Sequence, residues 1–207
     1  MPRLRKPQFN QDRQNERLSF LFEGAWGHKA ERRKDGGNSG QEVNVAMKYH
    51  DITKDDMKNG DGLRVVLWLS GCEHGCPGCQ NPVTWDPEDG LVFDEAAKRE
   101  LFEILGKPYI SGITLSGGDP LYPGNRGEVL RLLKEIRENF PEKNVWCYTG
   151  YTYEDIASLE HLEYIDVLVD GKYVEALKDN QYHWAGSTNQ RIIDVKESRL
   201  CGSIVLH

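Results

Sequence analysis

The stretch RVVLWLSGCEHGCPGCQ, residues 64–80, joins a strand-like run to a loop that carries three cysteines. Residues 64–70 are β-branched or aliphatic on both faces, which is typical of a strand that is buried on both sides. Strands of this kind occur mainly in parallel sheets whose faces are covered by helices. The stretch therefore predicts an α/β protein in which a chemically equipped loop follows a buried strand.

The rest of the chain alternates between strand and helix patterns. Helices are predicted over residues 94–106, 128–138 and 152–159, and short strands over residues 113–116, 144–148 and 167–170. Asp94 is the expected N-cap of the first helix and Gly106 its stop, while Thr152 and Asp155 resemble a capping pair. Strands that alternate with helices imply βαβ units, so we expect a mainly parallel sheet.

Four loops come directly after predicted strands, and each carries glycine, cysteine or polar residues. They are residues 72–79, 116–120, 149–151 and 170–172. The carboxyl ends of parallel strands meet at one edge of a sheet, where ligands usually bind. We therefore expect the four loops to converge on a single site.

The first of these loops places Cys72, Cys76 and Cys79 within eight residues of Gly- and Pro-rich chain. Three thiolates can ligate three irons of a four-iron cluster and leave the fourth iron open, as a catalytic zinc keeps an open position. Electron carriers usually have four thiolates. A triplet without a fourth cysteine nearby therefore favours an open, catalytic cluster.

Two other interpretations of the triplet stay open. A structural zinc ion would take a fourth ligand from His74, Cys147 or Cys201, although zinc sites usually show two separated ligand pairs. An electron-transfer cluster would use a remote fourth thiolate. Cys147 lies in an apolar run and Cys201 is isolated near the end of the sequence, so neither is assigned a role. His74 is compatible with simple exposure to solvent.

The turn Gly117-Gly118-Asp119-Pro120 follows the predicted strand at residues 113–116. Two successive glycines permit positive φ angles and leave backbone amides and carbonyls open to a ligand. Carbonyl groups and the Asp119 carboxylate suit an α-ammonium group, such as that of a methionine moiety at the open iron. Many βα loops contain Gly-Gly, so the turn alone is weak evidence for a ligand site. It indicates such a site only together with the cysteine loop one βα unit earlier.

Composition limits the classes of function. Of the net charge of −7, residues 1–46 carry +3 (nine Lys/Arg, six Asp/Glu) and residues 47–207 carry −10 (17 Lys/Arg, 27 Asp/Glu). An acidic body disfavours nucleic-acid binding, and the longest apolar run falls far short of the ~20 residues of a membrane span. Five cysteines, three of them clustered, do not resemble a secreted disulfide framework. We expect a cytoplasmic protein without nucleic-acid or membrane partners.

Residues 1–46 differ in pattern from the rest of the chain. Their polar and Gly-rich part, residues 28–41, has too little apolar surface to offset the entropy of ordering it. We therefore expect a flexible amino-terminal extension over residues 1–46 and one compact domain over residues 47–207.

The cysteine triplet and the Gly-Gly-Asp-Pro turn together resemble the signature of the radical S-adenosylmethionine superfamily. Longer strings make the chain similar, over about residues 49–191, to the activating proteins of anaerobic ribonucleoside-triphosphate reductases. These strings are residues 59–62, 76–81, 84–85, 115–121, Trp146 with 149–151, 167–172 and 187–190. The triplet indicates the superfamily, and the strings indicate the family within it.

The resemblance implies a partial (β/α) barrel of the radical S-adenosylmethionine type. In such a fold Cys72, Cys76 and Cys79 would ligate three irons of a 4Fe-4S cluster. The residues that would contact S-adenosylmethionine are Gly78, Cys79 and Gln80 and, at its amino-acid end, Gly117, Gly118 and Asp119. Many superfamily members have an aromatic residue where this chain has Gly78, so the contacts of the adenine stay unassigned.

The resemblance also implies the reaction. An external one-electron donor, such as a flavodoxin-type protein, would reduce the cluster, and S-adenosylmethionine would be cleaved to a 5′-deoxyadenosyl radical. That radical would take a hydrogen atom from a glycine of the large catalytic subunit of an anaerobic ribonucleotide reductase, with no side chain acting as acid or base. The alternatives are an activase of another glycyl radical enzyme, of the pyruvate formate-lyase type, or a non-enzymatic metal-binding or electron-transfer module.

Overall fold

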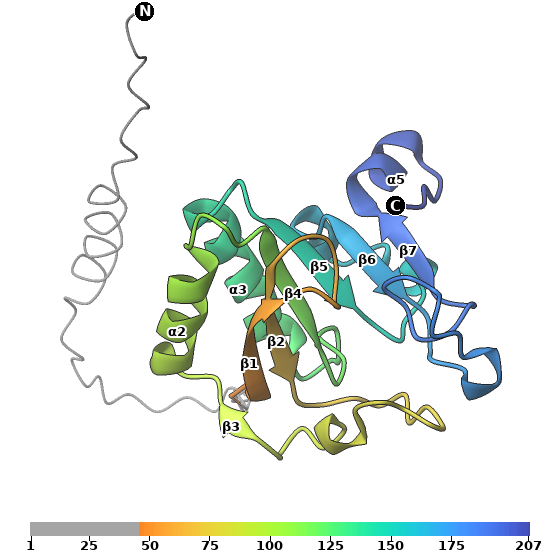
Figure 1. Cartoon of the computed structure of the whole chain (residues 1–207), viewed down its shortest axis with the longest axis horizontal. Coiled ribbons are helices and arrows are strands. Elements are labelled where there is room, and N and C mark those ends of the chain that lie inside the picture. Colours follow the sequence, from red (N-terminus) through yellow and green to blue (C-terminus); the bar gives the residue numbers. More distant parts are fainter. Residues whose placement is uncertain (1–45) are drawn as a thin grey trace, which may run out of the picture. The chain divides into compact units, whose positions relative to one another are not determined.

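The computed structural model of the protein describes residues 46–207, which are built around one seven-stranded sheet (Figure 1). Across the sheet the strands follow the order β3-β1-β2-β4-β5-β6-β7. Their bounds are β1 (Lys48–Asp56), β2 (Arg64–Leu69), β3 (Leu91–Val92), β4 (Gly112–Gly117), β5 (Asn144–Tyr148), β6 (Val167–Asp170) and β7 (Arg191–Asp194). The α/β class predicted from the sequence is confirmed.

Helices connect the strands. The α-helices in residues 46–207 are α2 (Glu95–Leu105), α3 (Arg126–Asn139), α4 (Tyr153–Ile156) and α5 (Val195–Cys201). Short 3₁₀-helices form η1 (Pro82–Thr84), η2 (Glu160–Glu163) and η3 (Glu175–Leu177). The helices predicted after Asp94 and around residues 128–138 correspond to α2 and α3, so both are confirmed.

The four central strands, β2, β4, β5 and β6, pair in parallel. Leu67, Leu115, Cys147 and Leu168 stand side by side across them, and each is fully buried. In Figure 1, α2 and α3 lie in the connections between β2, β4 and β5. Parallel neighbours need a crossover connection, and these helices supply it.

The outer strands pair antiparallel, which the sequence prediction of a mainly parallel sheet did not include. β1 pairs antiparallel with both β2 and β3, and β7 pairs antiparallel with β6. The connection from β1 to β2 covers only residues 57–63. A connection this short can reverse the chain but cannot hold a crossover helix. The parallel arrangement therefore describes the centre of the sheet and not its edges.

Two helix boundaries test the sequence prediction in detail. The Asp94 side chain accepts hydrogen bonds from the amides of Ala96 and Ala97, so the predicted N-cap is confirmed; such a cap stabilises a helix by about 1 kcal/mol. The capping box of Thr152 and Asp155 is also present, but α4 ends at Ile156 and not at residue 159. The apolar residues that follow recur every three positions, a spacing typical of 3₁₀ turns.

The segment that precedes β7 covers the face of the sheet that carries Trp146, Val167 and Val169. Trp146, Val167 and Val169 form an apolar cluster there, and Trp184 and Ile192 pack against it. Segment 171–190 therefore lies over the carboxyl half of the sheet, on the side away from α2 and α3. This placement leaves a space between that segment and the loops that follow β2 and β4.

The described part of the chain contains no helix that is both long and apolar enough to cross a bilayer. The flexible extension expected over residues 1–46 falls, except for Ala46, outside the described residues. That expectation, and the domain boundary with it, stays a prediction.

Candidate metal centre

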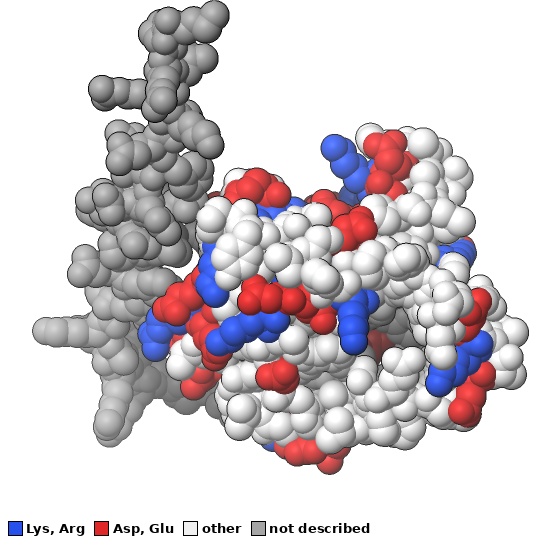
Figure 2. All heavy atoms as spheres, viewed as in Figure 1, with Lys and Arg blue, Asp and Glu red and all other residues white. Residues whose placement is uncertain are grey.

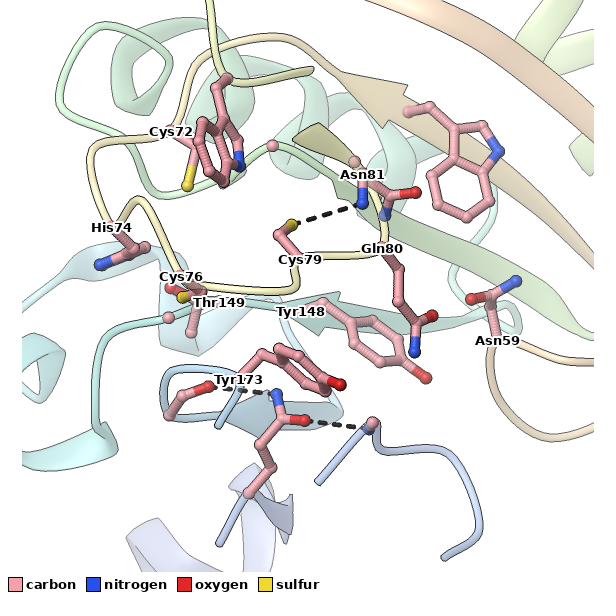
Figure 3. Close-up of a pocket in the computed structure, with 18 residues that line it drawn as sticks. Asn59, Cys72, His74, Cys76, Cys79, Gln80, Asn81, Tyr148, Thr149 and Tyr173 are labelled. Atoms are coloured by element: carbon pink, nitrogen blue, oxygen red, sulfur yellow. Dashed lines mark hydrogen bonds between the residues drawn. The ribbon is translucent and has the colours of Figure 1, made fainter. Parts of the chain in front are cut away.

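The loops at the carboxyl ends of the central strands line one cavity (Figure 3). Cys72, Cys76 and Cys79 come from the loop after β2, and the glycine turn comes from the end of β4. Thr149 and Gly150 after β5 and Gly171 after β6 complete this edge of the cavity. The structure thus brings together the four loops that the sequence placed after strands.

The cysteine loop is anchored at both ends by its own backbone. The amide of Gly71 donates to the carbonyl of Thr84 over 2.8 Å, and that of Cys72 donates to Trp85 over 3.0 Å. At the other end, the amide of Cys79 donates to the Cys76 carbonyl over 3.1 Å. These bonds fix the start of the loop and form a turn within it, and the three thiols line the same cavity.

The glycine turn lies in direct backbone contact with the cysteine loop. The amide of Gly118 donates to Leu69 and that of Asp119 donates to Gly71, both over 2.7 Å. A Cβ atom at Gly118 would lie 2.5 Å from the Gly71 carbonyl oxygen, and Gly117 has a φ of +101°. Neither position tolerates a side chain without displacing the backbone. Gly-Gly is therefore required by close packing as well as by access to a ligand.

Asp119 lies behind the cavity and does not line it. Its buried carboxylate accepts hydrogen bonds from the Leu121 amide at 2.8 Å, from the Thr149 hydroxyl at 2.9 and 3.0 Å, and from the Gly150 amide at 3.0 Å. The sequence assigned this carboxylate to the ammonium group of a ligand. In the structure its acceptor sites are used by groups of the protein, which join the β4 and β5 loops. The predicted contact with the ammonium group of a ligand stays a prediction.

His74 connects that carboxylate to the cysteine loop. Its Nε2 lies 2.6 Å from Asp119 Oδ2, and its side chain is only 6% exposed. The ring packs edge-on against Tyr151, with centroids 4.6 Å apart. The simple exposure considered from the sequence is wrong. A histidine between two cysteines gave no signal for this role, because its partner lies 45 residues further along the chain.

The other predicted contacts divide into two groups. Gln80, Gly117 and Gly118 line the cavity together with the thiols, whereas Gly78 does not. Gly78 has a φ of +71°, and a Cβ atom there would lie 2.5 Å from the carboxylate of Glu175. A side chain at position 78 would therefore meet η3 and not the cavity.

The remaining cysteines are separate from the cavity. Cys147 is fully buried on β5, and this burial raises the pKa of its thiol well above the usual value. Cys201 is exposed at the end of α5. Neither lines the cavity, so within residues 46–207 the triplet has no fourth thiol beside it. Of the zinc ligands considered from the sequence only His74 is near, and its Nε2 is engaged by Asp119.

The electrostatics of Cys72 favour ligation over nucleophilic chemistry. Burial raises the pKa of its thiol, so the free group stays protonated at neutral pH. Nucleophilic cysteines have a lowered pKa. A bound metal, by contrast, deprotonates a coordinating thiol outright. The Asn81 amide donates to Cys79 Sγ over 3.3 Å, the kind of hydrogen bond that stabilises a sulfur carrying negative charge.

Sequence reasoning gave no role to several residues that line the cavity. Asn59, Tyr148, Tyr173 and Gln190 are the clearest of these. The Gln190 carboxamide accepts from the amides of Gly186 and Ser187 and donates to the Gly171 carbonyl. It therefore fixes both ends of a loop that forms one wall of the cavity. Asn59 and Gln190 lie in the strings that carry the family resemblance, but those strings do not say what each residue contacts, and Tyr148 and Tyr173 lie outside them.

Three half-buried thiols line one cavity together with a glycine turn and without any Lys, Arg, Asp or Glu side chain, an arrangement that fits an iron–sulfur protein. Residues 58–193 match the family described as "4Fe-4S single cluster domain".

Similar proteins show to which family of iron–sulfur proteins the chain belongs. The chain is 48% identical over 146 residues to the anaerobic ribonucleoside-triphosphate reductase-activating protein of Enterobacteria phage T4, covering 70% of this chain and 93% of the relative. It is 43% identical over 148 residues to the protein of that name from Escherichia coli K12, covering 70% and 96%. The protein of the same name from Vibrio cholerae is 39% identical over 150 residues, and the match covers 70% of this chain and 97% of the relative. The chain belongs to this family of anaerobic ribonucleoside-triphosphate reductase-activating proteins.

Proposed function

We propose that the protein activates an anaerobic ribonucleotide reductase by reductive cleavage of S-adenosylmethionine at a 4Fe-4S cluster. The observation that carries the proposal is the cavity in which three thiols and the turn at Gly117 and Gly118 face the same space. Three thiolates leave one iron free for a ligand. The family named above, whose members carry the name of reductase-activating proteins, supports the same conclusion.

The residues present fit such a cluster. Cys72, Cys76 and Cys79 are free thiols on one short loop, and the Asn81 amide already donates to one of the sulfurs. When bound, the cluster supplies the single electron for cleaving S-adenosylmethionine, after which a hydrogen atom is taken from a glycine of the reductase. The protein's part is to hold the reactants in position and to exclude water.

Backbone groups of the glycine turn are proposed to receive the amino-acid end of S-adenosylmethionine. Gly117 and Gly118 offer amides and carbonyls without side chains, which suits close approach of a polar ligand. Cys79 and Gln80 are proposed to lie along the same molecule, since both line the cavity. For Gly78 the proposal is limited to its backbone, because its Cα faces Glu175.

No side chain of the cavity needs to act as an acid or a base. Burial and a hydrogen bond to Glu73 raise the pKa of the Tyr151 hydroxyl, and burial raises that of Tyr148. Both phenols therefore stay protonated at neutral pH and serve as fixed dipoles. Asp119 and His74 act indirectly: the hydrogen bond between them holds the cysteine loop against the glycine turn.

We further propose that the parallel strands β2, β4, β5 and β6 with α2 and α3 are the partial (β/α) barrel of radical S-adenosylmethionine enzymes. The crossover helices on one face and a cavity at the carboxyl ends of the strands support this. We propose a cytoplasmic location and an external one-electron donor of the flavodoxin type, without nucleic-acid or membrane partners. Free thiols support the reducing compartment.

The test is to change Cys72, Cys76 or Cys79 singly to Ala, with Cys201→Ala as the matched control. Each of the first three variants should lose the cluster absorbance and at least ~99% of 5′-deoxyadenosine formation, because the electron for the cleavage comes from the cluster that the three thiolates would hold. Cys201→Ala should behave as the unchanged protein. Normal turnover after loss of Cys76 would refute the assignment of the ligands.

The target is tested on the reductase. The reduced protein with S-adenosylmethionine should produce a glycyl radical doublet by electron paramagnetic resonance, and the doublet should vanish when the partner's radical glycine is replaced by alanine. A doublet that forms only on a pyruvate formate-lyase type enzyme would remove the reductase from the proposal and leave the radical chemistry in place.

A further inference from the structure

A second hollow, which we call the outer hollow, lies beside the metal centre. It is lined by residues of the cysteine loop, of the start of α3 and of the segments that follow β5 and β6. His74 and Gly150 line both the outer hollow and the cavity of the thiols, so the two spaces adjoin. In Figure 3 His74 lies at one margin of the cavity, beside Cys76, and Asn59 lies at the opposite margin.

An aromatic pair forms the wall between the outer hollow and the thiols. His74 stands two residues from Cys72 and two from Cys76 in the same loop, and its ring packs edge-on against Tyr151 with centroids 4.6 Å apart. Tyr151 is half-buried and lines the hollow. Electron transfer slows steeply with distance and is faster through bonds and packed atoms than across solvent. The pair therefore provides a packed route from the hollow to the thiols.

Two cations of the outer hollow form no salt bridge with any carboxylate of residues 46–207. One is Arg126, which donates through Nε to the Leu121 carbonyl over 2.7 Å and whose guanidinium lies over the Tyr151 ring, 5.3 Å from its centroid. The other is Lys172, which is exposed. Both charges are thus available to a molecule that enters the hollow.

The two carboxylates of the outer hollow, by contrast, are bound within the protein. Glu73 accepts the hydroxyl of Tyr151. Asp155 accepts from the Thr152 amide over 3.1 Å and from the Thr152 hydroxyl over 2.7 Å. The hollow therefore presents cationic donors that lack a charged acceptor among the described residues, and carboxylates of another molecule are acceptors that match them.

The proposed function requires an entry for electrons that stays open while the cavity is in use. Under that function S-adenosylmethionine occupies the cavity and the reductase approaches its mouth, so a third molecule has to reach the cluster from another side. We propose that the outer hollow is the docking site of the one-electron donor, a protein whose exposed redox group is bordered by carboxylates. In the step itself the donor loses one electron and the cluster gains it, and no bond forms or breaks.

This inference rests on the proposed function and adds the place and the charge of the donor's contact. Residues 47–207 carry a net charge of −10 (17 Lys/Arg, 27 Asp/Glu), and Figure 2 shows both signs mixed over the face drawn. A carboxylate-bearing donor is therefore repelled by the body as a whole and is retained only where unpaired cations meet it. The contact is small, as is usual for electron-transfer complexes.

The experiment changes the charge of the outer hollow and leaves the thiols in place. Lys172→Glu is compared with Lys178→Glu, because Lys178 is exposed on the same segment but lines neither the hollow nor the cavity. Arg126→Gln removes the second cation, and Arg99→Gln, on the exposed side of α2, is its control. Each variant is made in the full chain and loaded with its cluster under anaerobic conditions.

Two rates are measured for each variant. The first is the second-order rate constant for reduction of the cluster by reduced flavodoxin, followed by the bleaching of the cluster absorbance. The second is 5′-deoxyadenosine formation with dithionite, a small reductant that needs no docking site. Lys172→Glu should lower the first by about tenfold and Arg126→Gln by about threefold, and both should keep the second within about twofold. Both controls should match the unchanged protein.

Salt gives an independent readout of the same contact. Added NaCl screens exposed charges, so it should slow the flavodoxin reaction of the unchanged protein more than that of Lys172→Glu. An equal salt dependence of the two proteins would contradict a charged contact at this position.

The outcomes separate the inference from the proposed function. An equal flavodoxin rate constant in all variants would mean that the donor docks elsewhere, and an equal loss of both rates in Lys172→Glu and Arg126→Gln would mean that the hollow only supports the metal centre; either overturns the inference. A lower yield of glycyl radical with dithionite, at an unchanged flavodoxin rate constant, would assign the hollow to the reductase and also overturn it. If the unchanged protein forms no 5′-deoxyadenosine even with dithionite, the proposed function itself fails.

Discussion

Two aspartates at the carboxyl ends of parallel strands are equally buried, at 1% exposure each: Asp119 follows β4, and Asp170 ends β6. Asp170 is bound by the Arg191 guanidinium and by the Tyr153 amide, and Glu154 adds a second carboxylate to Arg191. Asp119 has no Lys or Arg partner within residues 46–207. It is bound by amides, a hydroxyl and the His74 imidazole.

The difference shows how similar residues serve different ends. A guanidinium is permanently charged and fixes Asp170 strongly, which suits a strand end that closes the sheet at β7. Asp119 is held by hydrogen bonds to groups of three loops, none of them a permanent charge, and each of these loops lines the cavity. The carboxylate of Asp170 therefore stabilises the fold, and the carboxylate of Asp119 aligns the loops of the metal centre.

The largest effect is expected from Asp119→Asn. Whichever oxygen becomes an NH₂ group, it will face a backbone amide, of Leu121 or of Gly150, that needs an acceptor. Leaving buried donors unsatisfied costs about 1–3 kcal/mol each, so the free energy of unfolding of the apoprotein should fall by about 3 kcal/mol. The iron content after anaerobic reconstitution should fall as well. Urea unfolding under reducing conditions and iron analysis measure the two quantities.

Asp170→Asn is the matched comparison and should have a smaller effect. Arg191 is one-third exposed and keeps its bond to Glu154, so its charge is not left alone. We expect the free energy of unfolding to fall by about 2 kcal/mol, with an iron content equal to that of the unchanged protein. If Asp170→Asn lost iron as severely as Asp119→Asn, the division into fold and metal centre would be wrong.

Glu154→Gln should have the smallest effect and gives the comparison a pH dependence. Hydrogen bonds from Arg191 lower the pKa of Glu154 from 4.5 to about 2. A lowered folded-state pKa stabilises the protein above the unfolded value, and the gain is lost as the pH falls from 4.5 toward 2. Because Glu154 is largely exposed, the difference between the two proteins at pH 7 should be only about 0.5 kcal/mol.

That difference should shrink below about pH 4.5 in urea unfolding measured at successive pH values. If the difference in the free energy of unfolding grew on acidification, the titration of a group other than Glu154 would determine the strength of the Glu154–Arg191 ion pair. Glu160→Gln, on a salt bridge away from this cluster, is a suitable control.

The centre of the fold could be predicted because its signals are strong and local. The strand at residues 144–148 and the capped helix α2 were predicted from apolar spacing and caps, and the structure has both. β1 was missed because its sequence, KYHDITKDD, is polar and interrupted by register shifts that destroy the alternation. β7 was missed although β6, which is equally short, was predicted: VLVD has three apolar residues in a row, whereas RIID has only two between charged residues.

The sequence singles out the three thiols of the candidate site, whose ligation of a cluster stays a prediction, but not the residues that support them. Cysteine spacing is readable because metal ligation restricts it, and the three thiols do line one cavity. The link between His74 and Asp119 could not be read, because it depends on how two loops meet in space. Asn59, Tyr148 and Gln190 likewise owe their positions to the sheet, which brings distant segments to one edge.

The contact between Gly118 and the Gly71 carbonyl has a consequence for the synthesis of the protein. A polypeptide leaves the ribosome from its amino end, so the thiols emerge well before the turn and the β5 loop that hold them; Thr149 follows Cys79 by 70 residues (149 − 79). Until those residues have been made and the strands have paired, the cysteine loop lacks the contacts that the glycine turn and the β5 loop give it. The complete cavity around the thiols therefore forms only after the strands of the sheet have been translated.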